Sequence, residues 1–468
     1  MEQPAQPNKP RSRLYKIAGR FHRIGREVVG VGKDVREISE MQRRKMLRYG
    51  RMLGPGLIAG AADDDAGGIA TYSIVGATTG YALSWLLLVS TPMLIVVQGM
   101  CARLGNVARK GLAAAIREKF GFHAALFATA LLVLANTATI SADIAGMGVA
   151  LELLSAAVFP GGISWLWFVI PGTLVLGYLI VYKNFNTIQK GLMYLSFVLV
   201  AYVAAGLISN PDWREILLKT FIPNVSLDST FLIAAVGLLG TTITPYLFFW
   251  QTRTEIEAHR GVEQMKRVKF DIFAGMAYSN LISYFIIIST AVVLFPHYNP
   301  AANTFAIGGE TINASDLSVR EIALALKPLA GDYTFYLFAI GLLAASTLAI
   351  IVLATSTAYT VCDTFGWEVG LNKRTWQAKQ FYAVIASALG VGALALFMGI
   401  NPLLAMFWSQ VLCGIADPIM LYFLMRIVND RRIMGEHANS WAENLVGWAT
   451  FAIIAGFVLM MAYSVAVH

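Results

Sequence analysis

The chain has 468 residues, of which 57% are hydrophobic and 14% are charged, and its mean hydropathy is +0.62. A soluble domain carries about 25% charged residues. The composition therefore excludes an ordinary soluble enzyme or binding domain and predicts a polytopic α-helical membrane protein. The net charge of +8 is misleading, because residues 1–51 hold 14 Lys and Arg against five acids and leave the remainder close to neutral.

Residues 1–51 read as a basic N-terminal arm. No cleaved signal peptide is expected, because the first apolar run begins only after residue 51. A basic arm can indicate nucleic acid, but beside a membrane it favours a cytoplasmic segment lying against anionic headgroups, with no nucleic-acid partner. The cysteines Cys101, Cys362 and Cys413 all fall in apolar segments, which predicts small buried core residues without a disulfide framework or a metal-ligand spacing.

Apolar runs of about 20 residues predict the membrane-spanning helices. They lie near 52–76, 82–103, 122–156, 163–182, 188–208, 229–256, 268–295, 331–362, 377–399, 402–428 and 441–465, which gives eleven. We divide the chain accordingly into the basic arm 1–51, a first five-helix repeat 52–208, a second five-helix repeat 209–428, and helix 11 with the C-terminus 429–468.

Positive charge predicts the orientation of these spans in a cell membrane. With the N-terminus in the cytoplasm, the inner loops hold 18 Lys and Arg and the outer loops hold four, namely Arg214, Lys219, Arg320 and Lys327. This distribution follows the positive-inside rule. Because eleven is an odd number of spans, His468 is expected outside the cell.

Three consecutive carboxylates, Asp63, Asp64 and Asp65, lie inside the first predicted span. No Lys or Arg lies at mid-depth in any span to pair with them. Since an unpaired charge at the membrane centre costs at least about 2.5–3.5 kcal/mol, they must be protonated, hydrated or neutralised by a bound cation. Gly67 and Gly68 permit a local break that turns several groups into one cavity. The pattern favours a transporter ion site, although Asp65 also suits the N-cap of the second half-helix.

A second break is predicted in "VGLLGTTITPYLFFWQT", five helices later. Pro245 lacks a backbone N–H and clashes with the preceding turn. Thr241, Thr242 and Thr244 come just before it, where their oxygens are placed to repair freed backbone groups or to bind an ion. Helices 1–5 and 6–10 then form two antiparallel halves, and each half opens with a discontinuous helix.

The first break resembles the natural resistance-associated macrophage protein (Nramp) family of divalent-metal transporters. Aligned from "GPG" at 54–56, the family's Asp-Pro-Gly-Asn pattern falls on Asp65, Ala66, Gly67 and Gly68. The resemblance runs from about Gly54 to the end of helix 10. It implies an all-α membrane protein of eleven transmembrane helices with a LeuT-like 5+5 inverted repeat and discontinuous helices 1 and 6.

Two further motifs carry the resemblance, each with a departure. The Met-Pro-His pattern of the family's sixth helix falls on Thr244, Pro245 and Tyr246. The third helix, "ATISADIAGMGVAL", keeps the family's Asp as Asp143 and has Gly146 where the family has Glu.

These departures indicate which metal the site favours. The family's Asn and Met are direct ligands, and Gly68 and Thr244 remove both of them, including the only sulfur. Carboxylate, hydroxyl and carbonyl oxygens remain, around a wider cavity. Mg²⁺ keeps waters and is held by one or two carboxylates, whereas a thioether favours transition metals. The sequence therefore resembles the Nramp-related magnesium transporter branch, and transport of Mg²⁺ and also Mn²⁺ is expected.

Proton coupling is expected to be absent. All six histidines, His22, His123, His259, His297, His437 and His468, lie in loops, termini or helix ends. Tyr246 replaces the sixth-helix His and does not titrate near neutral pH, and Gly146 replaces the third-helix Glu. A uniporter is predicted, because the membrane potential supplies about 4.6 kcal/mol per 100 mV for a divalent ion.

The residues predicted to meet the ion or its water shell are Asp65, Asp64, Asp63, Gly68, Thr241, Thr244, Ala62 and Gln410. Asp143, Asp417, Tyr246 and Gly146 are predicted along the permeation path. The Gln410 amide equally suits a coordinated water or an interhelical hydrogen bond, and Tyr72 suits simple packing. No catalytic residue, resident cofactor or required oligomer is expected; the partners are the metal ion and the bilayer.

Three other functions stay open at this point. One is a proton-coupled importer of Mn²⁺ or Fe²⁺. Another is a Na⁺-coupled symporter of an organic solute with the same fold, which the three acids disfavour because they repel a substrate carboxylate. The third is an intramembrane aspartyl protease, in which Asp65 shares a proton with Asp143 or Asp417, although no Gly-x-Gly-Asp sequence is present.

Overall fold

The structure is a computed structural model that describes residues 54–156, 158–159, 161–182, 197, 200–208, 211–307, 309–319, 321–323, 332–371 and 373–467. Gly54–His468 forms one compact unit. The basic arm 1–51, His22 and His468 lie outside the described residues.

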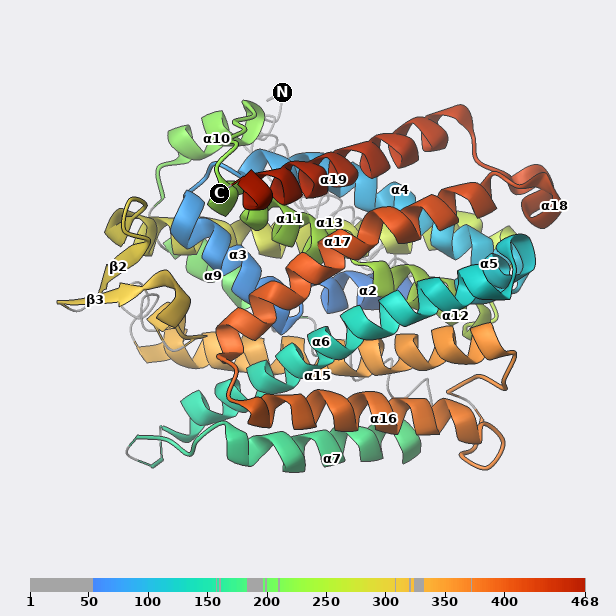
Figure 1. Cartoon of the computed structure of the whole chain (residues 1–468), viewed down its shortest axis with the longest axis horizontal. Coiled ribbons are helices and arrows are strands. Elements are labelled where there is room, and N and C mark those ends of the chain that lie inside the picture. The colour runs from blue at the N-terminus through green and yellow to red at the C-terminus, as the bar shows by residue number, and fades with distance from the viewer. Residues whose placement is uncertain are drawn as a thin grey trace, which may run out of the picture. The chain divides into compact units, whose positions relative to one another are not determined.

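Sixteen α-helices are described in chain order (Figure 1). They are α2 (Pro55–Asp63), α3 (Ala66–Thr79), α4 (Ser84–Ala108), α5 (Leu112–Phe120), α6 (Phe122–Ser155), α7 (Leu166–Tyr182), α9 (Val200–Ile208), α10 (Trp213–Phe221), α11 (Ser229–Thr242), α12 (Pro245–Glu257), α13 (Met265–Val293), α15 (Asp332–Phe365), α16 (Lys379–Ala395), α17 (Pro402–Val428), α18 (Arg431–Met434) and α19 (Trp441–Val467). The short 3-10 helices are η2 (Val262–Gln264), η3 (Phe295–His297), η4 (Ala314–Asp316), η5 (Leu396–Met398) and η6 (Gly435–His437).

Eight described segments are long and apolar enough to cross a membrane. They are Ser84–Ala108, Phe122–Ser155, Ser229–Glu257, Val262–His297, Phe338–Phe365, Lys379–Met398, Pro402–Val428 and Trp441–Ala466. A multi-pass α-helical membrane protein is therefore the class that the structure supports, as the composition predicts.

The prediction of eleven spans is confirmed only in part, because eight spans are found in the described residues. The first predicted span, 52–76, is divided into α2 and α3, which are each too short to cross alone. The fourth corresponds to α7, an apolar helix of 17 residues. The fifth, 188–208, lies mostly outside the described residues, and α9 is its described end. Eleven spans, and the division into two repeats, stay predictions.

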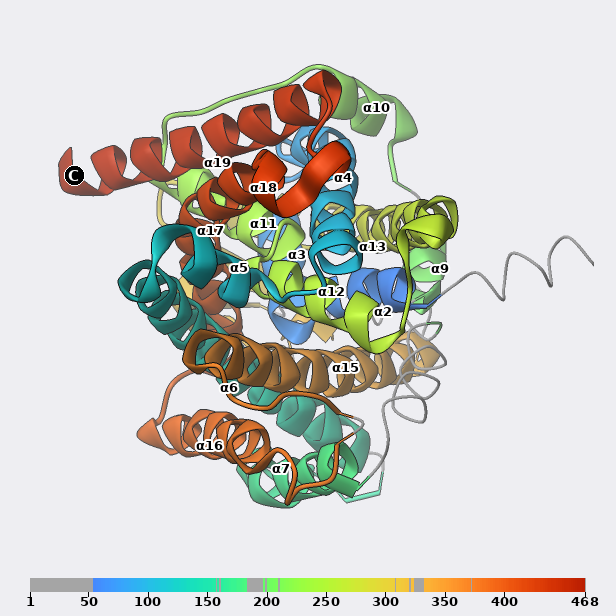
Figure 2. The same cartoon turned by 90° about the vertical axis from the view of Figure 1, so that its right-hand side faces the viewer.

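The two interrupted helices lie in the middle of the bundle. α7 and α16 lie side by side in an outer layer against α6, and α19 lies on the opposite side against α17 and α11 (Figures 1 and 2). Between these layers α13 packs against both α2 and α3, while α17 packs against α3 and α11. Both breaks are therefore surrounded by protein, which is where irregular backbone is tolerated at membrane depth.

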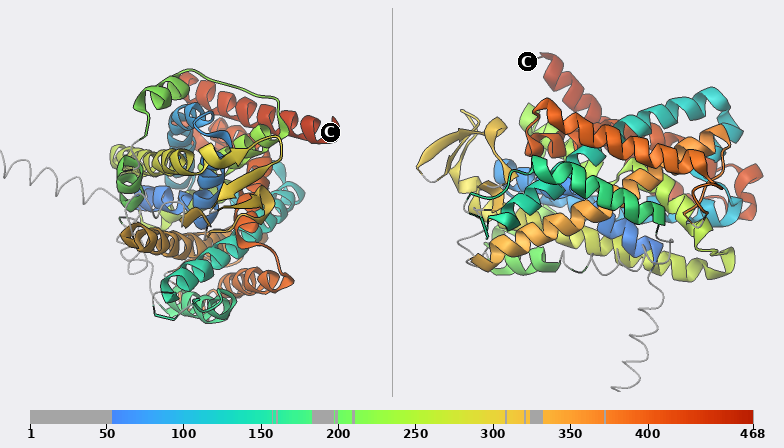
Figure 3. Two further views of the ribbon diagram at one scale, coloured as in Figure 1. Left: turned by 90° about the vertical axis from the view of Figure 1, so that its left-hand side faces the viewer. Right: turned by 90° about the horizontal axis from the view of Figure 1, so that it is seen from below.

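A small antiparallel sheet, which was not predicted from the sequence, lies in the connection between α13 and α15. Its strands are β1 (Tyr298–Asn299), β2 (Thr304–Ile307) and β3 (Glu310–Asn313) in the order β1-β2-β3. Tyr298 pairs with Phe305, and Thr304 pairs with Asn313. The sheet lies at the end of the bundle opposite α18 (Figures 1 and 3).

Glycines allow α2 and α13 to touch backbone to backbone. A Cβ atom placed on Gly60 would overlap the carbonyl group of Gly275 on α13, and one on Gly275 would overlap the carbonyl of Gly56. Small residues permit this kind of close approach between membrane helices. The contact fixes the height of α2 against α13 and therefore the height of the first break.

Replacing Gly60 by Ala should destabilise the protein by about 1–3 kcal/mol, because the added methyl group meets backbone that cannot move aside. Gly99→Ala is the matched control, since a Cβ atom at Gly99 on α4 has nothing within 4 Å. That control should be neutral or slightly stabilising. Thermal unfolding in detergent measures both, and equal unfolding temperatures for the two variants would contradict the close contact.

Candidate functional site

The first break separates the three carboxylates. α2 ends at Asp63, Asp64 follows with φ −85° and ψ 55°, and Asp65 adopts an extended conformation as the N-cap of α3. The Asp65 side chain accepts a hydrogen bond from the backbone N–H of Gly68. Two non-helical residues in succession turn neighbouring side chains into different directions. The alternative role of Asp65 as an N-cap is therefore present in the structure.

The carboxylates of Asp63 and Asp64 face α12 and α13. Asp63 accepts hydrogen bonds from Thr244 Oγ1 at 2.8 Å and from Ser279 Oγ at 3.4 Å. Asp64 Oδ1 accepts from Ser279 Oγ at 3.2 Å and from Ser283 Oγ at 2.8 Å. All these side chains are fully buried. Hydroxyl groups thus surround both acids, and this side of the break is lined by oxygen.

The carboxylate of Asp65 faces α17 instead. The amide of Gln410 donates to both Asp65 oxygens, at 3.2 and 3.1 Å. Asp143 on α6 approaches the same break, because its Oδ1 accepts a hydrogen bond from the backbone N–H of Ala66 at 3.0 Å. The predicted interhelical role of Gln410 is thus present, and its Oε1 atom has no hydrogen-bond partner.

The second break faces the first. α11 ends at Thr242 and α12 begins at Pro245, with Thr244 as its N-cap. A proline costs little there, because the first N–H of a helix has no intrahelical partner. The hydroxyl of Tyr246 donates to the carbonyl of Ala62 at 2.7 Å. Side chains at the second break therefore form hydrogen bonds directly with residues at the first break.

Gly68, which was predicted to widen the site, and Gly146, which was predicted along the permeation path, are tightly packed in this structure. A Cβ atom on Gly68 would lie 2.8 Å from Thr241 Oγ1, and one on Gly146 would lie 2.9 Å from Ser346 Oγ. Asp63, Asp64 and Asp65 have no exposed surface. The site is thus closed to solvent on both sides, and a wider cavity requires the helices to move apart.

Several buried oxygens around the breaks lack a hydrogen-bond partner. They are Asp64 Oδ2, Tyr72 Oη, Asp143 Oδ2, Thr241 Oγ1, Gln410 Oε1 and both carboxylate oxygens of Asp417. A buried polar atom without a partner is costly and rare. In the part of the chain that the structure describes, no three His, Cys, Asp or Glu side chains converge on one point. A cation here would depend on few carboxylates, on neutral oxygens and on its own waters.

α13 contributes two site residues that were not predicted from the sequence. Ser279 and Ser283 lie one helical turn apart and contact the acids, and the only signal for them is their spacing of four residues inside an apolar segment. The nearby thiol of Cys413 lies 3.6 Å from Thr139 Oγ1. This thiol makes no hydrogen bond with the three acids, and Cys413 is buried, as predicted for a core cysteine.

A buried ionic network holds the start of α2. The carboxylate of Asp271 on α13 accepts hydrogen bonds from the backbone N–H groups of Gly54, Gly56 and Leu57, at 2.8, 3.0 and 3.1 Å. Arg260 donates to Asp271 at 2.9 Å and lies 3.3 Å from Glu255. A carboxylate at a helix N-terminus satisfies otherwise unpaired N–H groups. One half of the interrupted helix is therefore anchored by a residue 214–217 positions away.

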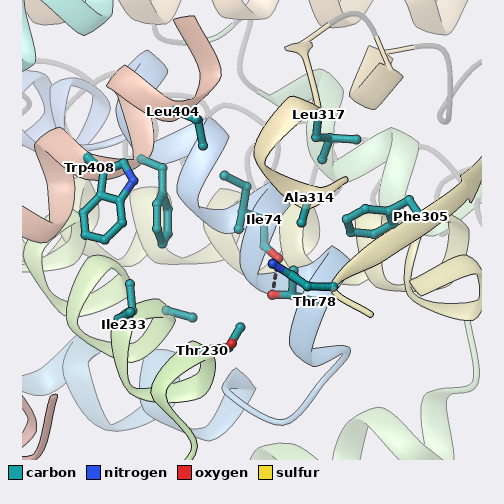
Figure 4. A pocket seen from close by; sticks show the side chains of 12 residues that line it. Ile74, Thr78, Thr230, Ile233, Phe305, Ala314, Leu317, Leu404 and Trp408 are labelled. Carbon is teal, nitrogen blue, oxygen red and sulfur yellow. Dashed lines mark hydrogen bonds between the residues drawn. The ribbon is translucent and has the colours of Figure 1, made fainter. Parts of the chain in front are cut away.

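An apolar cavity of about 260 Å³ lies toward the other end of the same elements. Figure 4 shows its lining, with side chains from α3, α11 and α17 and from the connection that holds the sheet, including Ile74, Ile233, Phe305, Leu317 and Trp408. α3 carries Asp65 at its start, and α17 carries Gln410 two residues after Trp408. The cavity is thus an apolar neighbour of the site.

Two interrupted helices with buried carboxylates between them define a membrane transporter of the broken-helix class. The model of the Natural resistance-associated macrophage protein-like (Nramp) family matches residues 56–464, and the chain belongs to this family. This is a family of transporters and not of enzymes, which sets the aspartyl protease alternative aside.

Two curated relatives cover most of this chain. The divalent metal cation transporter MntH of Caldanaerobacter subterraneus subsp. tengcongensis is 28% identical over 448 residues, which is 92% of this chain and 97% of that protein. MntH of Deinococcus radiodurans is 27% identical over 411 residues, covering 86% of this chain and 87% of that protein. Neither name specifies magnesium.

Two solved structures show the same fold. The manganese transporter of Eremococcus coleocola superposes with a TM-score of 0.66 at 20% identity, covering 88% of this chain and 85% of that one. Mhp1, a nucleobase-cation-symport-1 family transporter in a closed conformation, gives a TM-score of 0.50 at 14% identity, covering 89% and 93%. At these identities the likeness concerns the arrangement of helices alone.

Proposed function

We propose that this chain carries divalent metal cations across the membrane, with Mg²⁺ as its preferred ion and Mn²⁺ as a second one. The class of cargo rests on the family and on relatives named as divalent metal and manganese transporters. The preference for Mg²⁺ rests on the chemistry of the two breaks in this chain.

The observation that carries the proposal is the set of side chains that form hydrogen bonds with the three acids. Thr244, Ser279 and Ser283 offer hydroxyl oxygens, and Gln410 offers an amide. Hard oxygen donors suit Mg²⁺, which keeps several waters and is held by one or two carboxylates. Thr244 stands where the family pattern has Met, so the thioether that would favour a transition metal is absent from the helix break.

Movement of the ion requires the closed breaks to open alternately. On one side the path meets the apolar cavity between α3, α11 and α17. On the other side α2 is held by Asp271 and Arg260. Asp417 lies two helical turns beyond Gln410 on α17, and both of its buried carboxylate oxygens are without a partner. We assign Asp417 to the inner path, where an unpaired acid attracts the departing cation.

We further propose that uptake is not coupled to protons. The four histidines in the described residues are His123, His259, His297 and His437, and each lies at a helix end or in a connection. Tyr246, at the position of the family's His, donates its hydroxyl proton to the Ala62 carbonyl. Histidine is the side chain that titrates near neutral pH. The orientation with the N-terminus in the cytoplasm belongs to the same proposal.

Uptake into proteoliposomes tests the proposal directly. With an inside-negative potential, Mg²⁺ should enter vesicles that contain the purified full chain, while a trapped pH indicator records no acidification beyond that of empty vesicles. A potential of 100 mV supplies about 4.6 kcal/mol for a divalent ion, so no second ion is needed. Acidification in step with Mg²⁺ entry would refute the uniport mechanism, and entry of Mn²⁺ alone would refute the Mg²⁺ preference.

Thr244→Met tests the basis of the selectivity. The variant loses the hydroxyl that donates to Asp63 and gains a thioether at the break. We expect the ratio of Mn²⁺ to Mg²⁺ uptake to rise by about tenfold or more. Thr242→Met is the matched control, because the Thr242 hydroxyl donates to the carbonyl of Leu238 within α11 and does not contact the acids. An unchanged ratio in Thr244→Met would contradict the role of the donor set.

A further inference from the structure

A polar cavity of about 430 Å³ lies at the end of the bundle opposite the sheet. It is formed where α5 and α17 end, where α18 follows, and where α19 begins. Its lining includes Lys119, Arg426, Asn429, Arg431, Asn444 and Trp448. None of these residues takes part in the helix breaks, so this cavity is separate from the proposed ion site.

The cavity carries an excess of positive charge that the protein itself does not neutralise. Lys119 donates to Asp430 at 2.7 Å, and this hydrogen bond holds the pKa of the Asp430 carboxyl below its usual range. Lys119 and Asp430 therefore offset one another. The side chains of Arg426 and Arg431 make no hydrogen bond or ion pair with any described residue. Two guanidinium groups are left to face the same cavity.

Amide groups on its wall add a further donor. Asn444 Oδ1 accepts hydrogen bonds from Asn429 at 2.7 Å and from Asn439 at 3.0 Å. Since its oxygen is occupied twice, the Asn444 NH₂ group remains as the donor available to a ligand. Guanidinium and amide N–H groups together suit a phosphate, which accepts several charge-assisted hydrogen bonds at once.

The apolar residues at and beside the cavity indicate which kind of molecule contains the phosphate group. Trp448 lines the cavity and is 38% exposed. Next to the lining, Leu445 on α19 is 56% exposed, and Tyr422 on α17 packs edge to face against Trp448 with ring centroids 6.4 Å apart. α17 leaves the apolar span at Val428 and α19 enters it at Trp441, so the basic groups lie at the level of the headgroups. Exposed aromatic rings at this level are typical of the membrane interface.

We propose that this cavity binds the phosphate of an anionic phospholipid, with its acyl chains along α17 and α19. Arg426 and Arg431 bind the phosphate oxygens, and Trp448 contacts the glycerol and upper acyl region. Basic pockets between membrane helices recognise acidic headgroups in this way. The lipid links α5, α18 and α19 to α17, the helix that carries Gln410.

The test measures thermal unfolding of the purified full chain in detergent with added dioleoyl-phosphatidylglycerol, dioleoyl-phosphatidylcholine or inorganic phosphate. Phosphatidylglycerol should raise the unfolding temperature by about 3 °C or more relative to phosphatidylcholine at saturation. In R426Q/R431Q its half-saturating concentration should rise by at least about tenfold. The unfolding temperature of this variant in phosphatidylcholine should equal that of the parent, because both side chains are exposed.

K266Q/K269Q is the charge-matched control, since it removes two exposed basic side chains of α13 that do not line the cavity. It should keep the full response to phosphatidylglycerol. A parent-like response in R426Q/R431Q, or an equal loss in K266Q/K269Q, would overturn the proposal. An equal shift with inorganic phosphate alone would overturn it too, because the cavity would then be a site for free anions.

Discussion

Replacing Asp65 by Asn is expected to reduce Mg²⁺ uptake by about a hundredfold and to leave the fold intact. Asn removes the negative charge and keeps the shape, so its side-chain oxygen still accepts the hydrogen bond from Gly68 N–H at the start of α3. Asn and Asp are equally good N-caps, and the free energy of unfolding should change by less than about 1 kcal/mol. Uptake into proteoliposomes and thermal unfolding measure the two effects separately.

Asp228→Asn is the matched control for this variant. Asp228 is the N-cap of α11 and accepts a hydrogen bond from Phe231 N–H, so it has the same structural role at the other interrupted helix. It does not contact the breaks, and its replacement should leave uptake unchanged. If Asp65→Asn transported Mg²⁺ as fast as the parent, Asp65 would be a cap alone and the assignment of the ion site would be wrong.

Replacing Asp271 by Ala is the variant expected to cost the most stability. It removes the acceptor for three backbone N–H groups at the start of α2 and for Arg260. Breaking a buried, hydrogen-bonded ion pair typically costs about 3–5 kcal/mol. The start of α2 should also detach from α13. Thermal unfolding measures the first effect, and alkylation of a cysteine introduced at Ile58 measures the second.

Asp430→Ala serves as the control at the same end of the bundle. Its ion pair with Lys119 is partly exposed, with 18% and 23% of the two side chains accessible, so its loss should cost no more than about 1 kcal/mol. Ile58 is 1% exposed in the folded protein and should react slowly in that background. Slow alkylation in Asp271→Ala as well would show that Asp271 does not hold α2 in place.

The positions of both helix breaks could be predicted from the sequence because their causes are local. Pro245 cannot continue a helix from the preceding turn. Gly67 and Gly68 were predicted to unwind, but they lie in the first turn of α3, and the break falls just before them. The structure places the two interruptions at Asp64 and Asp65 and at Ile243 and Thr244. The proline therefore locates its break, and the glycine pair locates the other break only approximately.

The directions of the three carboxylates could not be predicted in the same way. They depend on the backbone angles of Asp64 and Asp65, and the first of these, with ψ 55°, is not a helical value. The acids were predicted to face one shared cavity. In the structure they face two different sides of the break, with Asp65 toward α17 and Asp64 toward α13. Helical periodicity describes a continuous helix and carries no information once the helix is interrupted.

The contacts between helices could not be predicted from the sequence either. Asp271 reads as an isolated acid near the start of an apolar run, and nothing nearby in the sequence relates it to Gly54. Ser279 and Ser283 read as small polar residues on a membrane helix. Such pairings depend on how α2 and α13 cross, and that crossing is set by glycine contacts between segments more than 200 residues apart.

The proposed magnesium site at the first helix break is tested most directly by isothermal titration calorimetry. The purified full chain and its Asp65→Asn variant are each titrated with Mg²⁺, Mn²⁺ and Ca²⁺. The oxygen donors around the breaks predict saturable Mg²⁺ binding to the parent, Mn²⁺ binding at the same site shown by competition, and loss of both in Asp65→Asn. Binding of Mn²⁺ without Mg²⁺, or equal Mg²⁺ binding by the parent and Asp65→Asn, would contradict a magnesium site at the first helix break.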